Sequence, residues 1–185
     1  LELLKENDDI KIINEQIIPA LNEIGNDFEN KKLFLPQLLV SSETAKVSFD
    51  IIKNNSKSNK NSGTKIVLAT VKGDIHDIGK NIVKMLLENY GYTVIDLGKD
   101  VEPKSILDAV IKNGVNICGL SALMTTTVQN MKETIELLKD KAPNCKTIVG
   151  GAVLTKEYAN SIGADFYAKD AMETVKIVQT IEKEI

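Results

Sequence analysis

The sequence feature that most constrains the fold is a regular alternation of apolar runs and helical segments after residue 63. Apolar, β-branched runs predict strands over 65–71, 93–97, 115–120 and 147–149, with a weaker one over 164–167. Helical segments follow them at about 78–90, 103–113, 127–140, 154–162 and 171–184. Such an alternation is typical of parallel sheets covered on both faces. We therefore predict an α/β domain with a five-stranded, doubly wound parallel sheet, of the flavodoxin-like or Rossmann-like kind.

The same pattern predicts where a ligand would bind. In doubly wound sheets, ligands lie beyond the carboxyl ends of the strands, at the point where the strand order reverses. For a flavodoxin-like order, this point lies between the loops after the first and third strands. We therefore expect the functional residues in segments 71–81 and 119–127.

Residues 1–53 differ from the rest of the chain, because their apolar residues recur only at helical spacing. One helix is predicted over about 10–24 and a second from about Pro36, a residue that suits a first helical turn. Residues 54–63 contain only Asn, Ser, Lys and Gly, and such a stretch is typical of a flexible linker. The predicted organisation is a helical domain at 1–53, a linker at 54–63 and the α/β domain at 64–185.

Charge and hydropathy exclude several classes of partner. The net charge of −3 gives no reason to expect nucleic acid or an anionic membrane. No apolar run approaches the roughly 20 residues of a membrane span. All 23 basic residues are lysine, so an anionic ligand must be held without guanidinium groups. Cys118 and Cys145 lack metal-ligand spacing and suit buried thiols in a reducing cytoplasm. The chain begins with Leu, so we interpret it as part of a longer protein.

The loop after the first predicted strand contains the only histidine of the chain, His76, between Asp74 and Asp77. In one interpretation the carboxylates cap the next helix and His76 is an ordinary surface residue. The spacing Asp74-x-His76-x-x-Gly79 favours a metal ligand instead. Neutral imidazole binds late first-row metals well, and a carboxylate two residues away can accept a hydrogen bond from its other nitrogen. Gly79 would let a ligand approach the backbone without meeting a Cβ.

Hydroxyl and glycine residues follow the third and fourth predicted strands. The hydroxyls of segment 121–127 could bind a polar ligand or simply cap a helix, with Thr127 as the N-cap. Gly150 and Gly151 permit close contact with a ligand and suit an ordinary turn equally well. Each pattern is weak evidence by itself.

Together these segments resemble the cobalamin-binding module of cobalamin-dependent methionine synthase. The resemblance covers nearly the whole chain, in the order and at the spacing of that family. The matching segments are 69–83, 119–127, 150–152 and 167–171 in the α/β part, and 24–28 and 33–38 in the helical part, which looks like the cap over the upper face of the corrin. The family's cap has four helices, whereas residues 1–53 give two clear helices and a stub at 1–6.

The resemblance implies a cobalamin cofactor, loaded as methylcobalamin, with His76 as the lower axial ligand of cobalt and Asp74 hydrogen-bonded to His76. Thr127 stands where the family has a serine that completes this network, and its β-branched side chain is more restricted at χ1.

Further cofactor contacts follow from the same resemblance. Ser121 and Thr125 would contact the nucleotide tail. Phe28, Leu35 and Leu38 would shield the methyl group while also packing the cap. The other implied contacts are Gly73, Ile75, Asp77, Gly79 and Leu123 around the corrin, and Gly150, Gly151 and Ala171 along the pocket of the tail.

The implied function is methyl transfer from methyltetrahydrofolate to homocysteine, with folate- and homocysteine-binding domains as partners in the same parent chain. The module alone is expected not to catalyse. The nearest alternative is a corrinoid protein of a methanol or methylamine methyltransferase system; segments 34–38 and 167–171 favour methionine synthase. A cobalamin-dependent sensor gains no support from a basic face or a DNA-binding helix pair. A plain flavodoxin-like or response-regulator-like domain explains neither the flanked His76 nor the helical cap.

Overall fold

The structure is a computed structural model that describes residues 9–55 and 63–184. The chain divides into two compact units, Leu1–Asn59 and Lys60–Ile185. Each unit is described by itself below.

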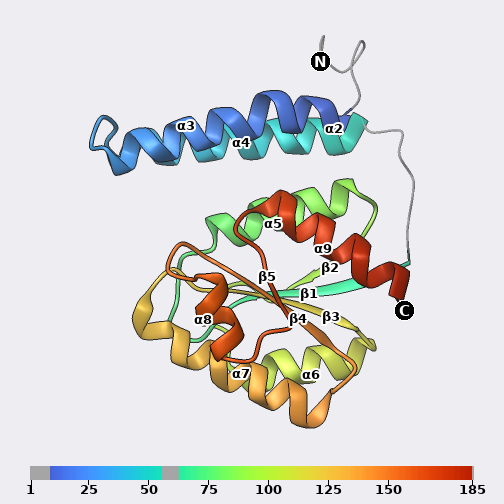
Figure 1. The fold of residues 1–185 in the computed structure, drawn as a ribbon. Helices are drawn as coiled ribbons and strands as arrows, with labels where there is room; N and C mark the ends of the chain where they lie inside the picture. The colour runs from blue at the N-terminus through green and yellow to red at the C-terminus, as the bar shows by residue number, and fades with distance from the viewer. Residues whose placement is uncertain (1–8, 56–62, 185) are drawn as a thin grey trace. The chain divides into compact units, whose positions relative to one another are not determined.

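The helical unit is a hairpin of two antiparallel helical arms (Figure 1). The first arm comprises α2 (Asp9–Ile12), a π-helical segment (Ile13–Ile17) and α3 (Ile18–Glu29), and the second is α4 (Leu35–Asn55). The helix predicted over 10–24 thus contains a π-helical turn just before Pro19. A proline inside a helix removes a backbone donor and crowds the carbonyl four residues earlier, which explains the change of geometry. Pro36 lies in the first turn of α4, as predicted.

The structure describes only part of the expected linker at 54–63. Asn54 and Asn55 end α4 and are helical. Residues 56–62 lie outside the described part of the chain, as does the stub expected at 1–6.

The α/β unit contains a five-stranded parallel sheet with the strand order β2-β1-β3-β4-β5. This is the flavodoxin-like order, so the predicted fold class is confirmed. The strands are β1 (Lys65–Thr70), β2 (Thr93–Asp96), β3 (Ile117–Ser121), β4 (Lys146–Gly150) and β5 (Phe166–Tyr167). The helices are α5 (Ile78–Asn89), α6 (Pro103–Asn113), α7 (Val128–Lys141), α8 (Lys156–Ser161) and α9 (Ala171–Glu184), with a 3-10 turn at Thr125–Thr127.

Helices cover both faces of this sheet. Helices α5 and α9 pack together on one face, while α6 and α7 pack together on the other (Figure 1). The central strands β1 and β3 are buried except at Lys65 and Ser121, as their continuous apolar runs predicted. Helix α8 begins two residues later than predicted, at Lys156, because the Thr155 side chain caps it by accepting a hydrogen bond from the backbone N–H of Tyr158.

The strand order and register bring the ends of β1, β3 and β4 side by side. Thr70 pairs with Ser121, and Ser121 pairs with Gly150. The order reverses between β1 and β3, so the loops after these strands lie at the switch point, as predicted. Within residues 9–55 and 63–184, none of the helices combines the length and apolar character that crossing a membrane requires.

Candidate functional site

The loop between β1 and α5 makes a tight turn before it reaches His76. Val71 still forms a parallel bridge with Val101, and the Asp74 N–H donates to the Val71 carbonyl at 3.0 Å. Gly73 lies in the turn at a φ of +81°. A Cβ at Gly73 would make only an ordinary contact, 3.4 Å from the γ-methyl of Thr127, so it is the positive φ that favours glycine here.

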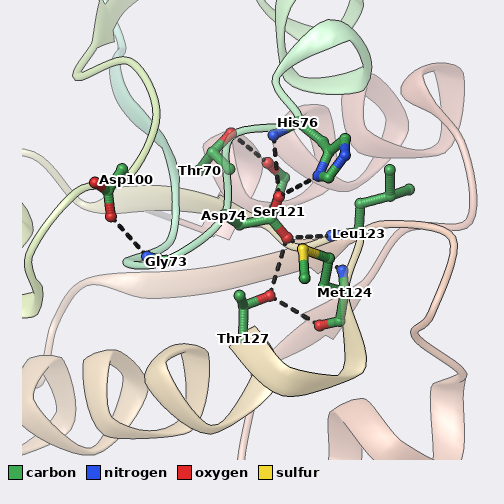
Figure 2. A network of polar contacts seen from close by, with 9 residues as sticks. All are labelled: Thr70, Gly73, Asp74, His76, Asp100, Ser121, Leu123, Met124 and Thr127. Carbon is green, nitrogen blue, oxygen red and sulfur yellow. Dashed lines mark hydrogen bonds and ion pairs between the residues drawn. The ribbon is translucent and has the colours of Figure 1, made fainter.

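Asp74 is fully buried and accepts hydrogen bonds at both carboxylate oxygens (Figure 2). Its Oδ1 accepts from the backbone N–H of His76 at 3.0 Å and contacts the ring Nδ1 at 2.8 Å. Its Oδ2 accepts from the N–H groups of Leu123 at 2.7 Å and Met124 at 3.1 Å, and from the Thr127 hydroxyl at 2.9 Å. One carboxylate therefore joins the loops that follow β1 and β3.

These hydrogen bonds determine the charge of Asp74. Burial by itself raises the pKa of a carboxyl group, because it penalises the charged form. The donors from His76, Leu123 and Thr127 outweigh burial and lower the pKa of Asp74 well below its ordinary value. Asp74 is therefore a carboxylate at neutral pH, and it can only accept hydrogen bonds.

The protonation pattern of His76 follows from this carboxylate. Since Asp74 only accepts, the ring Nδ1 carries the proton, and Nε2 of the neutral ring keeps its lone pair. The side chain is 46% exposed, and the far edge of the ring points away from Asp74 (Figure 2). Large apolar side chains on the same two loops and at the start of α5 are also exposed, namely Ile75, Leu123, Met124 and Ile78. His76 thus offers a ligand nitrogen beside apolar surface.

This donor set fits a metal that brings most of its own ligands. In the described part of the chain, no group of three or more His, Cys, Asp or Glu side chains could hold a metal ion. A metal bound at His76 would therefore take its other ligands from a cofactor such as a macrocycle. The exposed apolar side chains on these segments would suit the face of such a macrocycle.

Thr127 occupies the N-cap position of α7, but its side chain makes no capping hydrogen bond. Its hydroxyl lies 2.9 Å from Asp74 Oδ2 and 2.8 Å from the Met124 carbonyl, so the capping interpretation of this side chain is wrong. The hydroxyl is therefore part of the Asp74–His76 network. It has one hydrogen to donate, and both the Asp74 carboxylate and the Met124 carbonyl lie within hydrogen-bond distance.

The ends of β1, β3 and β4 contact one another through a pair of hydroxyls and through close packing of two glycines. The hydroxyls of Thr70 and Ser121 lie 2.9 Å apart. A Cβ at Gly151, which has a φ of +140°, would lie 1.9 Å from the carbonyl oxygen of Ala122, while one at Gly150 would lie 3.0 Å from that of Ala168. Packing between loops therefore requires glycine at 151 whether or not a ligand is bound.

The remaining predicted contacts in the α/β unit lie along the same edge of the sheet. Asp77 is half-buried at the N-cap of α5 and makes no side-chain capping bond. A Cβ at Gly79 would meet nothing within 4 Å, so the packing of the chain does not require glycine there. Glycine in a helix costs about 0.5–1 kcal/mol relative to alanine, and close approach of a ligand would explain its presence. Thr125 is exposed, and Ala171 is half-buried at the start of α9.

The predicted methyl shield belongs to the helical unit. Phe28, near the end of α3, is 37% exposed. Leu35 and Leu38 lie in α4, and their side chains are outside what the structure describes. Their role as a shield stays a prediction.

The structure adds residues that the sequence analysis missed. Asp100 accepts a hydrogen bond from the Gly73 N–H at 2.7 Å, and its own N–H donates to the Asp74 carbonyl at 3.0 Å. Asn130 donates its side-chain N–H to the Lys72 carbonyl at 2.8 Å. The available signal was topological, because the loop after the second strand ends at the same edge of the sheet. Our sequence argument considered only the loops after the other strands.

Comparison with known proteins gives two family matches. Residues 64–176 match a B12 binding domain family, and residues 2–53 match a second B12 binding domain family.

Individual relatives match over nearly the whole chain. Dimethylamine corrinoid protein 1 of Methanosarcina acetivorans is 38% identical over 175 residues, which are 92% of this chain and 82% of the relative. The monomethylamine corrinoid protein of Methanosarcina barkeri superposes with a TM-score of 0.80 at 28% identity, covering 97% of this chain and 89% of that one. A chain of the methanol:cobalamin methyltransferase complex of Methanosarcina barkeri gives 0.65 at 28% identity, covering 99% and 71%.

Proposed function

The chain belongs to the B12 binding domain family, and we propose that it carries a methyl group on a bound corrinoid for a methylamine or methanol methyltransferase. Corrinoid binding itself follows from the family. The named methylamine corrinoid proteins support this branch, which was our alternative, over the methionine synthase that the resemblance favoured. Methionine biosynthesis gains no support from these relatives.

The observation that carries the proposal is the state of His76. The Nδ1 of its ring is held 2.8 Å from a buried carboxylate, while the side chain remains 46% exposed. An ordinary surface histidine also leaves its other nitrogen to water, but it makes no use of that nitrogen. A metal ligand requires it, because the lone pair of Nε2 is the donor.

The network around His76 would orient and tune this ligand. Asp74 would fix the tautomer and the direction of the ring, so that Nε2 is the nitrogen left for the metal. The Leu123 and Met124 amides hold Asp74 in place, and the Thr127 hydroxyl can donate its hydrogen bond either to Asp74 or to the Met124 carbonyl. When bound, the corrinoid supplies a cobalt centre that accepts and gives up a methyl group, and the protein supplies ligation, orientation and shielding.

The other predicted contacts would complete the binding site. Ser121 and Thr125 offer hydroxyls to the nucleotide tail, and the open space at Gly79 leaves room for it. Gly150, Gly151 and Ala171 would line the pocket of the tail. Phe28, Leu35 and Leu38 of the helical unit would cover the methyl group on the opposite face of the corrin.

The proposal also changes the expected partners. We expected folate- and homocysteine-binding domains in the same parent chain. The match to a chain of a methyltransferase complex supports a partner methyltransferase on a separate chain. In this arrangement the partner catalyses methyl transfer, and the present chain carries the group.

The methyl donor can be identified with a panel of methyltransferases. The protein is loaded with corrinoid, reduced, and mixed separately with methanol, monomethylamine, dimethylamine or trimethylamine and the matching methyltransferase. A parallel sample receives methyltetrahydrofolate with a folate-dependent methyltransferase. Methylation of the corrinoid is followed by visible absorption, with His76→Ala as the matched control.

The proposal predicts methylation with at least one methylamine or with methanol, and none with methyltetrahydrofolate. Methylation only from methyltetrahydrofolate would restore the methionine synthase interpretation. A corrinoid that stays unmethylated in every sample would favour a sensor, provided that free corrinoid reacts under the same conditions.

A further inference from the structure

Asp100, in the loop between β2 and α6, contacts the segment that carries Asp74. We propose that Asp100 is a positioning residue for the axial ligand His76, acting through Gly73 and Asp74. The inference rests on the proposed role of His76 as the cobalt ligand. It adds a loop outside the Asp74–His76–Thr127 network.

The contact is made on both sides of the Gly73–Asp74 segment. Asp100 Oδ1 accepts a hydrogen bond from the Gly73 N–H at 2.7 Å (Figure 2). Such a short distance is typical of hydrogen bonds to a charged acceptor. The Asp100 N–H donates to the Asp74 carbonyl at 3.0 Å. One residue thus holds the N–H at the start and the carbonyl at the end of the Gly73–Asp74 dipeptide, which limits how this turn can rotate.

The backbone of Asp100 is unusual. Its φ is +55°, a left-handed conformation that residues other than glycine seldom adopt. Aspartate tolerates it better than most residues, because its short polar side chain can hydrogen-bond locally. A glycine would meet the backbone requirement at lower cost but would lose the acceptor for the Gly73 N–H. Aspartate combines the acceptor with tolerance of this conformation.

The consequence for His76 follows along the chain. The carboxylate of Asp74 must reach the His76 ring and the amides of Leu123 and Met124 at the same time. The β3–α7 loop fixes the carboxylate, while Asp100 fixes the backbone on which it is carried. Without Asp100, the backbone would be held less firmly, and the ring would spend less time in the ligating orientation.

A neighbouring acid provides a matched control. Glu102 lies in the same loop and is exposed, and its carboxylate pairs with the side chain of Lys72 at 2.9 Å. Replacing Glu102 by glutamine removes one negative charge close to Asp100. It leaves the hydrogen bonds of Gly73 and Asp74 unchanged.

The first experiment examines the contact in the protein without cofactor. Amide hydrogen exchange at Gly73 is measured in the wild type, Asp100→Gly, Asp100→Asn and Glu102→Gln. We expect exchange at least tenfold faster in Asp100→Gly, and exchange close to wild type in the other two variants. Asparagine keeps both the left-handed conformation and a side-chain oxygen that accepts.

The second experiment examines ligation in the same variants after loading with methylcobalamin. The ratio of the His-bound to the His-free spectrum is recorded across pH. We expect roughly a tenfold lower ratio in Asp100→Gly, the scale of one lost hydrogen bond to a charged group. Its His-off transition therefore moves to higher pH. Asp100→Asn should restore the ratio to within about twofold, since most of the bond returns.

The inference is overturned if Asp100→Gly exchanges at Gly73 like the wild type, or if its spectral ratio is unchanged. It is also overturned if Glu102→Gln shifts the ratio equally, since loss of charge would then explain the effect. A wild type that shows no His-bound spectrum, matching His76→Ala, would contradict the proposed function itself. The hydrogen-exchange result separates that failure from a failure of the contact.

Discussion

At each end of the sheet, one carboxylate accepts hydrogen bonds from more than one donor. The two networks differ in whether one member keeps an atom that is free to bind a ligand. At the carboxyl end, Asp74 binds the amides of Leu123 and Met124 and the side chains of Thr127 and His76. At the amino end, Glu182 accepts hydrogen bonds from the Thr64 hydroxyl at 2.8 Å and the Tyr92 hydroxyl at 3.0 Å. Each network joins segments that are distant in the sequence.

The difference lies in Tyr92 at the amino end and His76 at the carboxyl end. Tyr92 is buried, and its hydroxyl ends on Glu182, so this network fastens α9 to the start of the sheet. His76 is half-exposed, and its second nitrogen has no hydrogen-bond partner among residues 9–55 and 63–184. A polar network thus indicates a functional site when one member keeps a ligand atom directed away from the others.

The largest expected effect comes from His76→Ala, which should abolish the His-bound spectrum. The free energy of unfolding without cofactor should fall by only about 1–2 kcal/mol, because the exposed ring supplies one of several hydrogen bonds to Asp74. Visible spectra and urea denaturation measure the two quantities. If His76→Ala lost stability but kept the His-bound spectrum, His76 would have a structural role and would not be the ligand.

Asp74→Ala should come next, because it removes a buried acceptor from several donors at once. We expect a loss of about 3 kcal/mol in the free energy of unfolding, together with weaker ligation by His76. Asp74→Asn is the matched variant, which should keep corrinoid bound but change the pH dependence of His ligation. An unchanged titration in Asp74→Asn would remove Asp74 from its proposed role.

Glu182→Gln should affect stability alone, by about 1 kcal/mol, since the amide still accepts one of the two hydrogen bonds. Its corrinoid spectrum should match that of the wild type. Urea denaturation and the methylcobalamin spectrum, measured on the same preparation, check both statements. A shifted spectrum would show that the amino end also acts on the site.

The two ends should respond to opposite extremes of pH. The lowered pKa of Asp74 contributes stability that is present above the ordinary carboxyl pKa of about 4 and is lost as pH falls below it. Burial and the bond to Glu182 raise the pKa of Tyr92 to about 12, so its contribution is present below pH 10 and is lost as pH rises towards 12.

These contributions can be separated by substitution. The stability of Asp74→Asn should fall less steeply in acid than that of the wild type, while Tyr92→Phe should fall less steeply in alkali. Unfolding by urea at a series of pH values measures both slopes. Equal slopes in variant and wild type would contradict the corresponding pKa shift.

Within the Asp74–His76–Thr127 network, the smallest effect on ligation is expected from Thr127→Ser. Thr127→Ser keeps the hydroxyl and loses the γ-methyl that lies near Gly73, so the His-bound fraction should change by less than about twofold. Thr127→Val keeps the shape and removes the hydroxyl, and should lower that fraction by roughly threefold to tenfold. If serine and valine behave alike, the hydroxyl has no part in the network.

How far the sequence predicts this molecule depends on the distance between the residues involved. Asp74 and His76 are two residues apart, so their pairing could be predicted from local spacing, and the structure confirms the contact. The fold class followed from apolar periodicity. The hydrogen bond between Asp100 and the Gly73 N–H joins residues that are 27 positions apart. The groups that Asp100 contacts belong to the backbone, so they leave no pattern in the sequence.

Gly151 and Thr127 show a second limit. A glycine after a strand suits a ligand or a turn equally well, and only the position of the Ala122 carbonyl shows that packing requires it. From residue type and position alone Thr127 suited a helix cap as well as the network that the resemblance implied, and the structure shows its hydroxyl bonded to Asp74. Competing local and distant partners cannot be ranked without coordinates.

The most direct test of His76 as the axial ligand uses the fact that the chain has a single histidine. The protein is prepared with ordinary histidine and with ¹⁵N-labelled histidine, loaded with cobalamin and reduced to the cobalt(II) state. The electron paramagnetic resonance spectrum then reports the axial nitrogen through its hyperfine splitting. The account predicts a triplet that becomes a doublet on labelling. A triplet that persists with ¹⁵N-histidine would show that the cofactor's own base is the ligand, and would contradict the account.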